Sequence, residues 1–342
     1  MVDSVLPRYD LPMNEEMPTP IDPTESLPAA LVEAAGAPPG PSEHRPPPTL
    51  RHARLLILAA AILWSTSGFF VKAPWFHGWS GASLAFWRAL FASLVLWPLV
   101  RRPEFSWKLI PMTLLFAAMN YGYLTAMANG TAANAIWLQF TAPAWVLIVG
   151  VLVFKERAVW RDWLLVAFAA AGVAVILHYE SRGASREAVA WGLASGLAYA
   201  GVVLSLRLLR MHDPAWLAAV NHTVTALLLA PFIFATDFFG TPAAPIPTGI
   251  QWPLLVALGI VQMGLPYVLF ARGLQRVPGH EATGIGLIEP ILVPLWTFLA
   301  WNERPAWWTL AGGALILAGL AIRYVAPASP SGRGRELSSG SN

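Results

Sequence analysis

The stretch PAWVLIVGVLVFKERAVW, from Pro143 to Trp160, is followed much later by a similar one, PILVPLWTFLAWNERPAW, from Pro290 to Trp307. Each begins with proline, carries a Glu-Arg pair near its end and finishes with tryptophan. Farther along, Gly172 and Gly319 stand at the same spacing from each other. Solenoid repeats are about 20–50 residues long, and this spacing is much longer. The pattern therefore predicts that one half of the protein duplicates the other.

The composition places most of the chain in a membrane. Of 342 residues, 56% are hydrophobic and only 12% are charged, whereas soluble domains have about 25% charged residues. The small net charge of +3 comes without a basic cluster, so no nucleic-acid partner is expected. The chain has no cysteine, which excludes disulfides, thiolate metal sites and cysteine nucleophiles.

Two terminal segments differ from the rest. Residues 1–50 are rich in proline and acidic side chains, and residues 326–342 are rich in glycine and serine. Such segments bury too little apolar surface to offset chain entropy, so both are predicted to be disordered tails. The first one has no basic start followed by an apolar core, so it is not expected to be a signal peptide.

Between the tails, the sequence contains apolar runs long enough to span a bilayer, which takes about 20 residues in a helix. Runs of this length without strict alternation favour helices over a barrel. Ten spans are predicted, at residues 54–72, 80–100, 107–127, 132–153, 160–178, 188–207, 214–236, 252–272, 281–300 and 306–325.

Basic residues near the span ends predict the orientation, because they favour the cytoplasmic side. With the N-terminus inside, the outer ends hold only Lys72, Arg182, Arg186 and Arg304. The inner ends hold the larger group: Arg51, Arg54, Arg101, Arg102, Lys108, Lys155, Arg157, Arg161, Arg207, Arg210, Arg272, Arg276 and Arg323. Both termini are therefore predicted to be cytoplasmic, in a bacterial inner (plasma) membrane.

The two Glu-Arg turns lie five spans apart, and five is odd. The second half, residues 188–325, is therefore predicted to cross the membrane upside down relative to the first, residues 54–178. Inverted repeats are typical of secondary transporters, with the substrate site near mid-membrane between the halves. Glu156 and Glu303 are expected to cap the following helix rather than to touch substrate.

At these residues the chain resembles the drug/metabolite transporter superfamily, in its ten-helix EamA-type branch. The shared features are the proline in the fourth and ninth spans, the following glutamate, and the glycine late in the fifth and tenth spans. The opening helix, AAAILWSTSGFFVKA, also looks like that of the family. The resemblance covers about residues 54–325. It implies the family's fold and transport of a small solute, often export of an amino acid or another metabolite.

Two ionisable residues lie deep within predicted spans, each about 12 Å from a span end by the rise of a helix. Arg88 always carries its charge, so it binds either a carboxylate-bearing substrate or a structural partner. Glu289 precedes Pro290, which bends the helix and frees a carbonyl. It is a candidate for proton coupling or substrate contact, and a fixed ion pair is the alternative. The position in the first half that matches Glu289 is Ala142, so the halves differ chemically here.

His222 is similarly deep and suits either a proton relay or a neutral hydrogen bond between helices. Asn120, Tyr121, Asn134 and several other polar residues also lie within spans. We predict a wet, aromatic-lined cavity between spans one to four and six to nine. The predicted substrate-binding residues are Trp64, Ser67, Arg88, Asn120, Gln139, Tyr199, His222, Gln262, Tyr267 and Glu289. No catalytic residue, metal or cofactor is expected.

Spans five and ten have no charge or amide within their apolar runs, so they are expected to form scaffold or to face lipid. Their small residues suit close packing, either within the chain or in a homodimer. The hypotheses for the whole protein are a secondary active transporter of an amino acid or related zwitterionic or anionic solute, or an exporter of drug-like, hydrophobic solutes. An intramembrane enzyme and a membrane scaffold are the remaining alternatives. No GxxxxGK[ST] loop for ATP is present.

Overall fold

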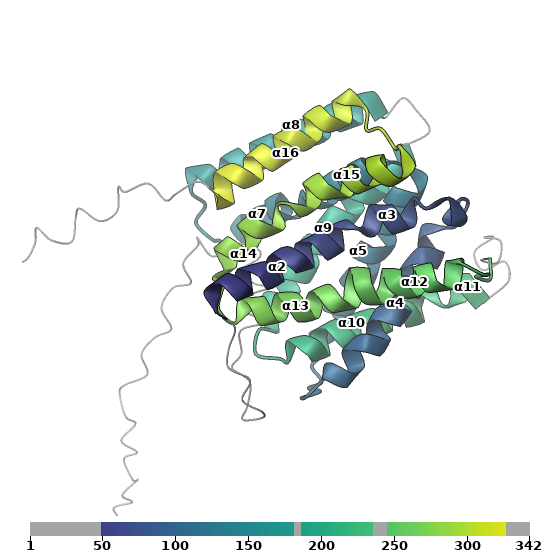
Figure 1. The fold of residues 1–342 in the computed structure, drawn as a ribbon. Helices are drawn as coiled ribbons and strands as arrows, with labels where there is room; N and C mark the ends of the chain where they lie inside the picture. Colours follow the sequence, from purple (N-terminus) through teal and green to yellow (C-terminus); the bar gives the residue numbers. More distant parts are fainter. Residues whose placement is uncertain (1–48, 181–185, 235–244, 326–342) are drawn as a thin grey trace, which may run out of the picture.

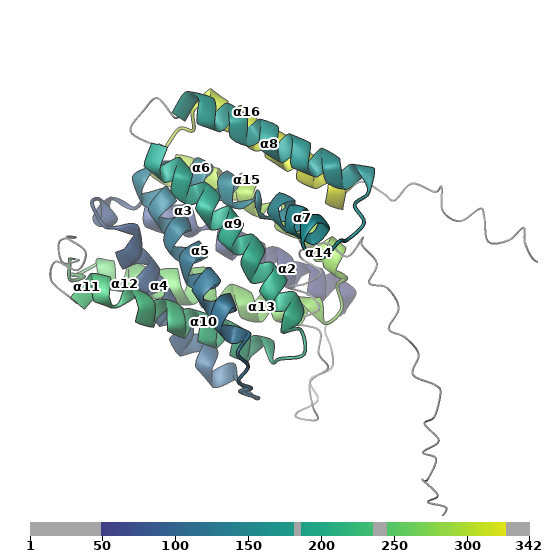
Figure 2. The same ribbon diagram turned by 180° about the vertical axis from the view of Figure 1, so that it is seen from behind.

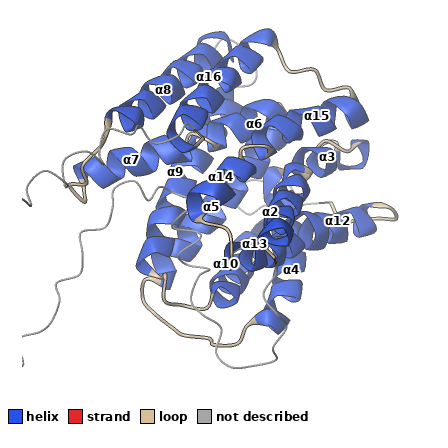
Figure 3. Ribbon diagram, turned by 60° about the vertical axis from the view of Figure 1, so that its left-hand side comes forward, coloured by secondary structure: helices blue, strands red, loops and turns tan. Residues whose placement is uncertain are grey.

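The computed structural model describes residues 49–180, 186–234 and 245–325. The tail segments, apart from residues 49 and 50, lie outside the described residues. The described part contains helices and loops and no strand (Figure 3). Within it, ten helical stretches are long and apolar enough to cross a membrane, from Leu50–Val71 to Trp307–Tyr324. The predicted all-α membrane fold is confirmed.

Several spans consist of more than one helical piece. The pieces, span by span, are α2 (Leu50–Ser65) with α3 (Ser67–Val71); α4 (Gly81–Leu96) with η2 (Trp97–Leu99); α5 (Leu109–Asn129); α6 (Ala132–Gln139) with α7 (Ala142–Leu152); α8 (Trp160–Glu180); α9 (Arg186–Leu208); α10 (Pro214–Leu229) with α11 (Pro231–Phe234); α12 (Gln251–Gly259), η4 (Ile260–Gly264) and α13 (Leu265–Leu274); α14 (Gly279–Gly286) with α15 (Glu289–Trp301); and α16 (Trp307–Tyr324). A short turn of helix, η1 (Pro74–Phe76), follows the first span.

Polar side chains begin several helices. The Thr49 hydroxyl accepts from the His52 amide at 3.3 Å, which starts α2 four residues before the predicted span. Ser80 caps α4 in the same way, at 3.1 Å from the Ser83 amide. Asp213 caps α10 through the Ala215 amide at 2.9 Å. These bonds satisfy amide groups that the helix itself leaves unpaired.

The two halves of the chain interlock. Helix α13 runs along α2, α9 along α5, α10 along α4, and α16 along α8, and in each pair one helix comes from each half. The α8–α16 pair forms a layer beside the remaining helices (Figures 1 and 2). The interface between the halves is therefore spread through the whole molecule.

Helices α8 and α16 meet at glycines. A Cβ atom at Gly172 would lie 2.4 Å from the Gly312 carbonyl oxygen, and one at Gly312 would lie 2.7 Å from the Gly172 carbonyl oxygen. Arg323 of α16 also forms an ion pair with the buried Asp162 of α8. The small residues of the fifth and tenth spans thus serve packing within the chain, and a homodimer stays a prediction.

The Glu-Arg turns do not cap the helices that follow them, so that expectation is wrong. Glu303 accepts at 2.8 Å from the Ala132 amide, at the start of α6. Glu156 lies 3.3 Å from Arg207 at the end of α9. The start of α8 is served instead by Asp162, whose carboxylate accepts from the Val159 amide at 2.8 Å. Each glutamate instead contacts a residue of the other half of the chain.

Candidate functional site: a cavity between the two halves

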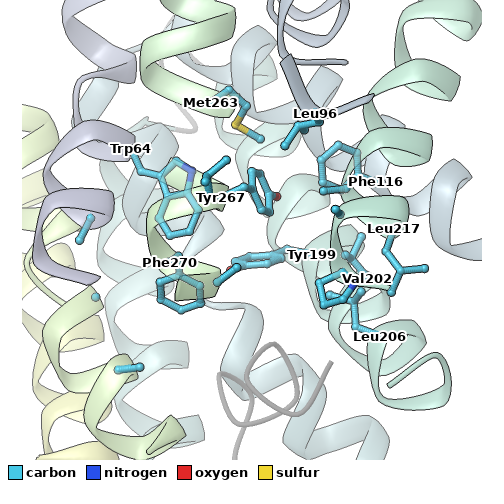
Figure 4. A pocket seen from close by; sticks show the side chains of 18 of the residues that line it. Trp64, Leu96, Phe116, Tyr199, Val202, Leu206, Leu217, Met263, Tyr267 and Phe270 are labelled. Carbon is cyan, nitrogen blue, oxygen red and sulfur yellow. The ribbon is translucent and has the colours of Figure 1, made fainter. Parts of the chain in front are cut away.

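A cavity of about 620 Å³ lies between helices of both halves. Ligand pockets typically occupy about 300–1,000 Å³, so it has room for a small solute. Figure 4 shows part of its wall, where aromatic and aliphatic side chains surround the space. Its lining runs from Ser67 and Arg88 at the inner end to Arg102 and Arg272 at the mouth.

The structure brings together all but one of the predicted site residues. Those that line the cavity are Trp64, Ser67, Arg88, Asn120, Gln139, Tyr199, Gln262, Tyr267 and Glu289. His222 lies behind the wall, fully buried, with its ring edge-on to Phe116 at 4.9 Å and to Tyr267 at 5.7 Å. Both of those rings line the cavity. His222 can therefore position the wall, while its predicted contact with substrate or protons stays a prediction.

Interruptions in the helices carry several of these side chains to the cavity. Span four breaks after Gln139, span nine breaks just before Glu289, and span one breaks just before Ser67. Pro143 and Pro290 follow the breaks in spans four and nine, where each lacks the amide that would bond to the preceding turn. Broken membrane helices of this kind are tolerated where the freed backbone lines a cavity.

A π-helical turn, η4, exposes two consecutive side chains to the cavity. Pro266 follows this turn and removes one helical amide donor. Gln262 donates through Nε2 to the Trp64 carbonyl oxygen at 2.9 Å. Its Oε1 is buried and has no partner in the described part of the chain. Met263 follows directly and also lines the cavity.

Arg88 is the cation at the inner end of the cavity, with 6% of its surface exposed. Its Nη2 donates to the Met263 sulfur at 2.8 Å, and its guanidinium lies 6.0 Å from the centre of the Tyr123 ring. Among the described residues, neither Nε nor Nη1 has a hydrogen-bond partner. Buried charges are ordinarily paired, so these two donors are available to an acceptor that enters the cavity.

Glu289 lines the same cavity from the other half of the chain. In the described structure its carboxylate has no hydrogen bond, and it is not within ion-pair distance of Arg88. Neither residue is therefore committed to the fixed partner that the structural alternative required. The guanidinium of Arg88 and the carboxyl group of Glu289 both border a space that a solute can enter.

Aromatic residues form much of the remaining wall. Trp64 packs edge-on against Tyr267 at 5.4 Å and tilted against Phe270 at 5.3 Å. The Tyr123 hydroxyl lies 2.8 Å from Ser67 Oγ. Among the lining residues that the sequence did not single out are Phe116, Tyr123, Met263 and Phe270. Three of them are apolar, and an apolar residue in a membrane span gives no signal that separates a cavity wall from a lipid contact.

Two polar residues noted in the sequence lie elsewhere. Tyr121 packs edge-on against Trp191 at 4.9 Å. Asn134 donates to Glu180 at 3.0 Å, and Glu180 also accepts from Trp308 at 3.1 Å. These contacts hold helices together rather than line the cavity.

The two ends of the bundle differ. At the end that we call the open end, the cavity mouth is bordered by Arg101, Arg102, Glu104, Asp213 and Arg272. At the opposite end, which we call the closed end, aromatic rings pack together. There the Trp301 indole donates to the Phe69 carbonyl oxygen at 2.7 Å, and Phe76 stacks edge-on against Trp79 at 5.2 Å. The open end corresponds to the side predicted to be cytoplasmic.

Comparison with known proteins agrees with this architecture. The model of the EamA-like transporter family matches the chain twice, at residues 52–178 and 186–325. The chain is 28% identical to an uncharacterized transporter of Archaeoglobus fulgidus, over 80% of this chain and 97% of that protein.

Two relatives have named cargo. The pseudopaline exporter CntI of Pseudomonas aeruginosa is 27% identical, over 69% of this chain and 83% of that protein. The biotin transporter of Escherichia coli is 25% identical, over 80% of this chain and 94% of that protein. A solved crystal structure of a protein shares the fold with a TM-score of 0.56 at 19% identity, covering 81% of this chain and 98% of that one.

Proposed function

The chain belongs to the EamA-like transporter family, and from this we propose that it is a secondary active transporter of a small solute with a carboxylate, such as an amino acid or a related zwitterion or anion. The observation that carries the proposal is the pair of unpartnered donors on Arg88 inside the cavity. A guanidinium forms strong, charge-assisted hydrogen bonds to a carboxylate, and Nε and Nη1 of Arg88 each offer one donor that has no partner among the described residues. Because such a site is buried, filling it satisfies donors that otherwise have no partner.

Glu289 is an acidic group that lines the same cavity as the basic group of Arg88. Its carboxylate borders the same cavity without a direct pair to Arg88, so a solute with both an amino group and a carboxylate can bridge the two. We also propose that Glu289 carries a proton during the cycle, since a half-buried carboxylate that loses a cationic ligand is stabilised by protonation. Solute efflux would then be driven by proton entry.

The mechanism that the architecture supports is alternating access. One family model matches the membrane region twice, once in each half. The cavity between the halves has a mouth at one end and packed aromatic rings at the other. A second state, in which the two halves exchange their conformations, would close the present mouth and open the other end. We propose export as the direction, in keeping with the exporter among the relatives.

A second candidate cargo is a drug-like or hydrophobic solute. The observation in its favour is the aromatic wall formed by Trp64, Phe116, Tyr267 and Phe270. Aromatic lining suits flat, apolar molecules. This candidate differs from the first because it does not require the guanidinium of Arg88.

A thermal-stabilisation screen separates these cargoes. Purified protein is heated with amino acids, other carboxylates, their methyl esters, and apolar amines. Native protein should be stabilised by carboxylates and not by the matching esters. In Arg88→Ala, carboxylate affinity should fall about 10- to 100-fold, because a hydrogen bond to a charged group contributes about 1.5–3 kcal/mol.

Arg272→Ala is the matched control, because Arg272 is an exposed cation at the mouth. Its affinity loss should be much smaller. Equal stabilisation by acids and esters would instead favour the hydrophobic cargo. A monodisperse Arg88→Ala protein that keeps full carboxylate affinity would remove Arg88 from the binding site.

A further inference from the structure

The two Glu-Arg turns have the same backbone geometry. The residue before each glutamate has a left-handed conformation, with φ of 57° at Lys155 and 54° at Asn302. The Glu156 amide donates to the carbonyl oxygen six residues earlier at 3.1 Å, and the Glu303 amide does the same at 3.3 Å. Left-handed backbone is unfavourable for residues with a Cβ. Both turns therefore hold their glutamate in a defined direction.

Each glutamate is paired with a cation that ends a helix of the other half. Glu303 lies 3.3 Å from Lys72, just after α3, and Glu156 lies 3.3 Å from Arg207, in the last turn of α9. Lys72 ends the first span and Arg207 ends the sixth, which is the equivalent span of the second half. The two ion pairs are thus related in the same way as the halves, one at each end of the bundle.

At the closed end the pair holds a third segment. Lys72 Nζ donates to the Gly130 carbonyl oxygen, and Glu303 accepts from the Ala132 amide at 2.8 Å. The turn between α5 and α6 is thereby fixed to spans one and nine. The side chains of Lys72 and Glu303 are 18% and 17% exposed, against 26% and 39% for Arg207 and Glu156. The closed-end pair is the more enclosed of the two.

The segment equivalent to Gly130–Ala132 in the second half is 277–279, between α13 and α14. It stands at the cavity mouth, because Gln275 before it and Ala282 after it both line the cavity. Helix α14 begins after Pro278, which offers no side-chain cap, whereas α6 has both Thr131 and Glu303 at its start. The start of α14 can therefore bind a glutamate carboxylate, as the start of α6 binds Glu303 at the closed end.

We propose that these two ion pairs are opposed latches of the transport cycle, an inference that rests on the alternating access proposed above. In the present state, Lys72 and Glu303 hold the turn at Gly130 and keep that end closed. When the cycle reverses, segment 277–279 moves onto Arg207 and Glu156 and shuts the present mouth. Each latch stabilises one state, and breaking it favours the other.

Single cysteines placed in this cysteine-free chain test the proposal. Ala133→Cys reports the closed end, because Ala133 is fully buried beside the latch. Ala218→Cys reports the cavity wall near the mouth. In purified protein, Lys72→Ala or Glu303→Ala should raise maleimide labelling at position 133 about tenfold, the effect of losing one charged hydrogen bond. Labelling at position 218 should fall.

The reversed pair Lys72→Glu with Glu303→Lys should not restore the native labelling, because a glutamate cannot donate to the Gly130 carbonyl oxygen and a lysine cannot accept from the Ala132 amide. Adding Glu156→Ala to Lys72→Ala should return labelling toward the native pattern, because it weakens the opposing latch. The matched control is Arg304→Ala, an exposed cation of the same turn whose side chain, among the residues that the structure describes, bonds only to Asn302. It should leave both positions unchanged.

Unchanged labelling in Lys72→Ala and Glu303→Ala would overturn the proposal. So would a Glu156→Ala variant that opens the closed end as Lys72→Ala does. If the alanine variants do not fold, Lys72→Gln and Glu303→Gln, which keep the hydrogen-bonding groups and remove the charge, are labelled instead and read in the same way. Labelling needs no substrate, so a negative result here leaves the proposed cargo untouched, and failure of the ligand screen leaves the latches standing.

Discussion

Arg88 and Glu289 enter the cavity from opposite halves of the chain, one from α4 and one from the start of α15. Their positions show why polar residues in a membrane span are informative. A charge placed in hydrocarbon costs about 2.5–3.5 kcal/mol on insertion scales, so such a residue needs a cavity or a partner. For these two residues the cavity is the solution, because they do not pair directly in the described structure.

Glu289→Gln should uncouple transport from protons. Glutamine has the shape of a protonated glutamate and cannot release the proton. In vesicles loaded with labelled solute, native protein should drive solute movement against its gradient when protons flow the opposite way. The variant should lose this driven movement and keep solute exchange at equal pH on both sides.

Glu281→Gln is the control for that measurement, since Glu281 pairs with Arg54 and is partly exposed at a span end. It should keep proton-driven movement. A Glu289→Gln protein that still moves solute uphill with the native pH profile would exclude Glu289 as the proton carrier.

At the scale of elements, the breaks in spans one, four and nine and the π turn in span eight determine which side chains reach the cavity. Gln139 and Glu289 could be predicted because a polar side chain within an apolar span is visible in the sequence, and Pro290 directly after Glu289 also indicated a bend there. The π turn was not predictable, because Pro266 alone does not specify how the preceding turn adjusts. Met263 was therefore missed, although it contacts Arg88.

The α8–α16 pair depends on close backbone approach. Gly172→Val should destabilise the protein by about 1–3 kcal/mol, the usual cost of overpacking, because any Cβ there meets the Gly312 carbonyl oxygen. The thermal midpoint in detergent measures the loss. Gly284→Ala is the control, since its nearest outside atom would be 4.0 Å away. Equal midpoints for the two variants would mean that the helix pair does not need this contact.

At the scale of the molecule, the sequence predicted ten spans and most of the polar cavity wall. Long apolar runs have one stable arrangement in lipid, as helices, and polar groups inside them gather where water or ligand reaches. Interior contacts were less predictable. Nothing in the spacing distinguishes Asn120, which lines the cavity, from Asn134, which donates to Glu180. Their difference arises only from how the helices rotate when they pack.

The inverted arrangement of the halves has a direct test. Arg157 and Arg304 are exposed and occupy equivalent places in the two Glu-Arg turns. Five spans separate the turns, so Arg304→Cys should be labelled in intact cells by a maleimide that does not cross membranes. Arg157→Cys should be labelled only after the cells are permeabilised. The unmodified chain, which has no cysteine, gives the background. Labelling of both positions from one side would mean that the halves run in the same direction across the membrane. Alternating access by two states in which the halves exchange conformations would then have no structural basis.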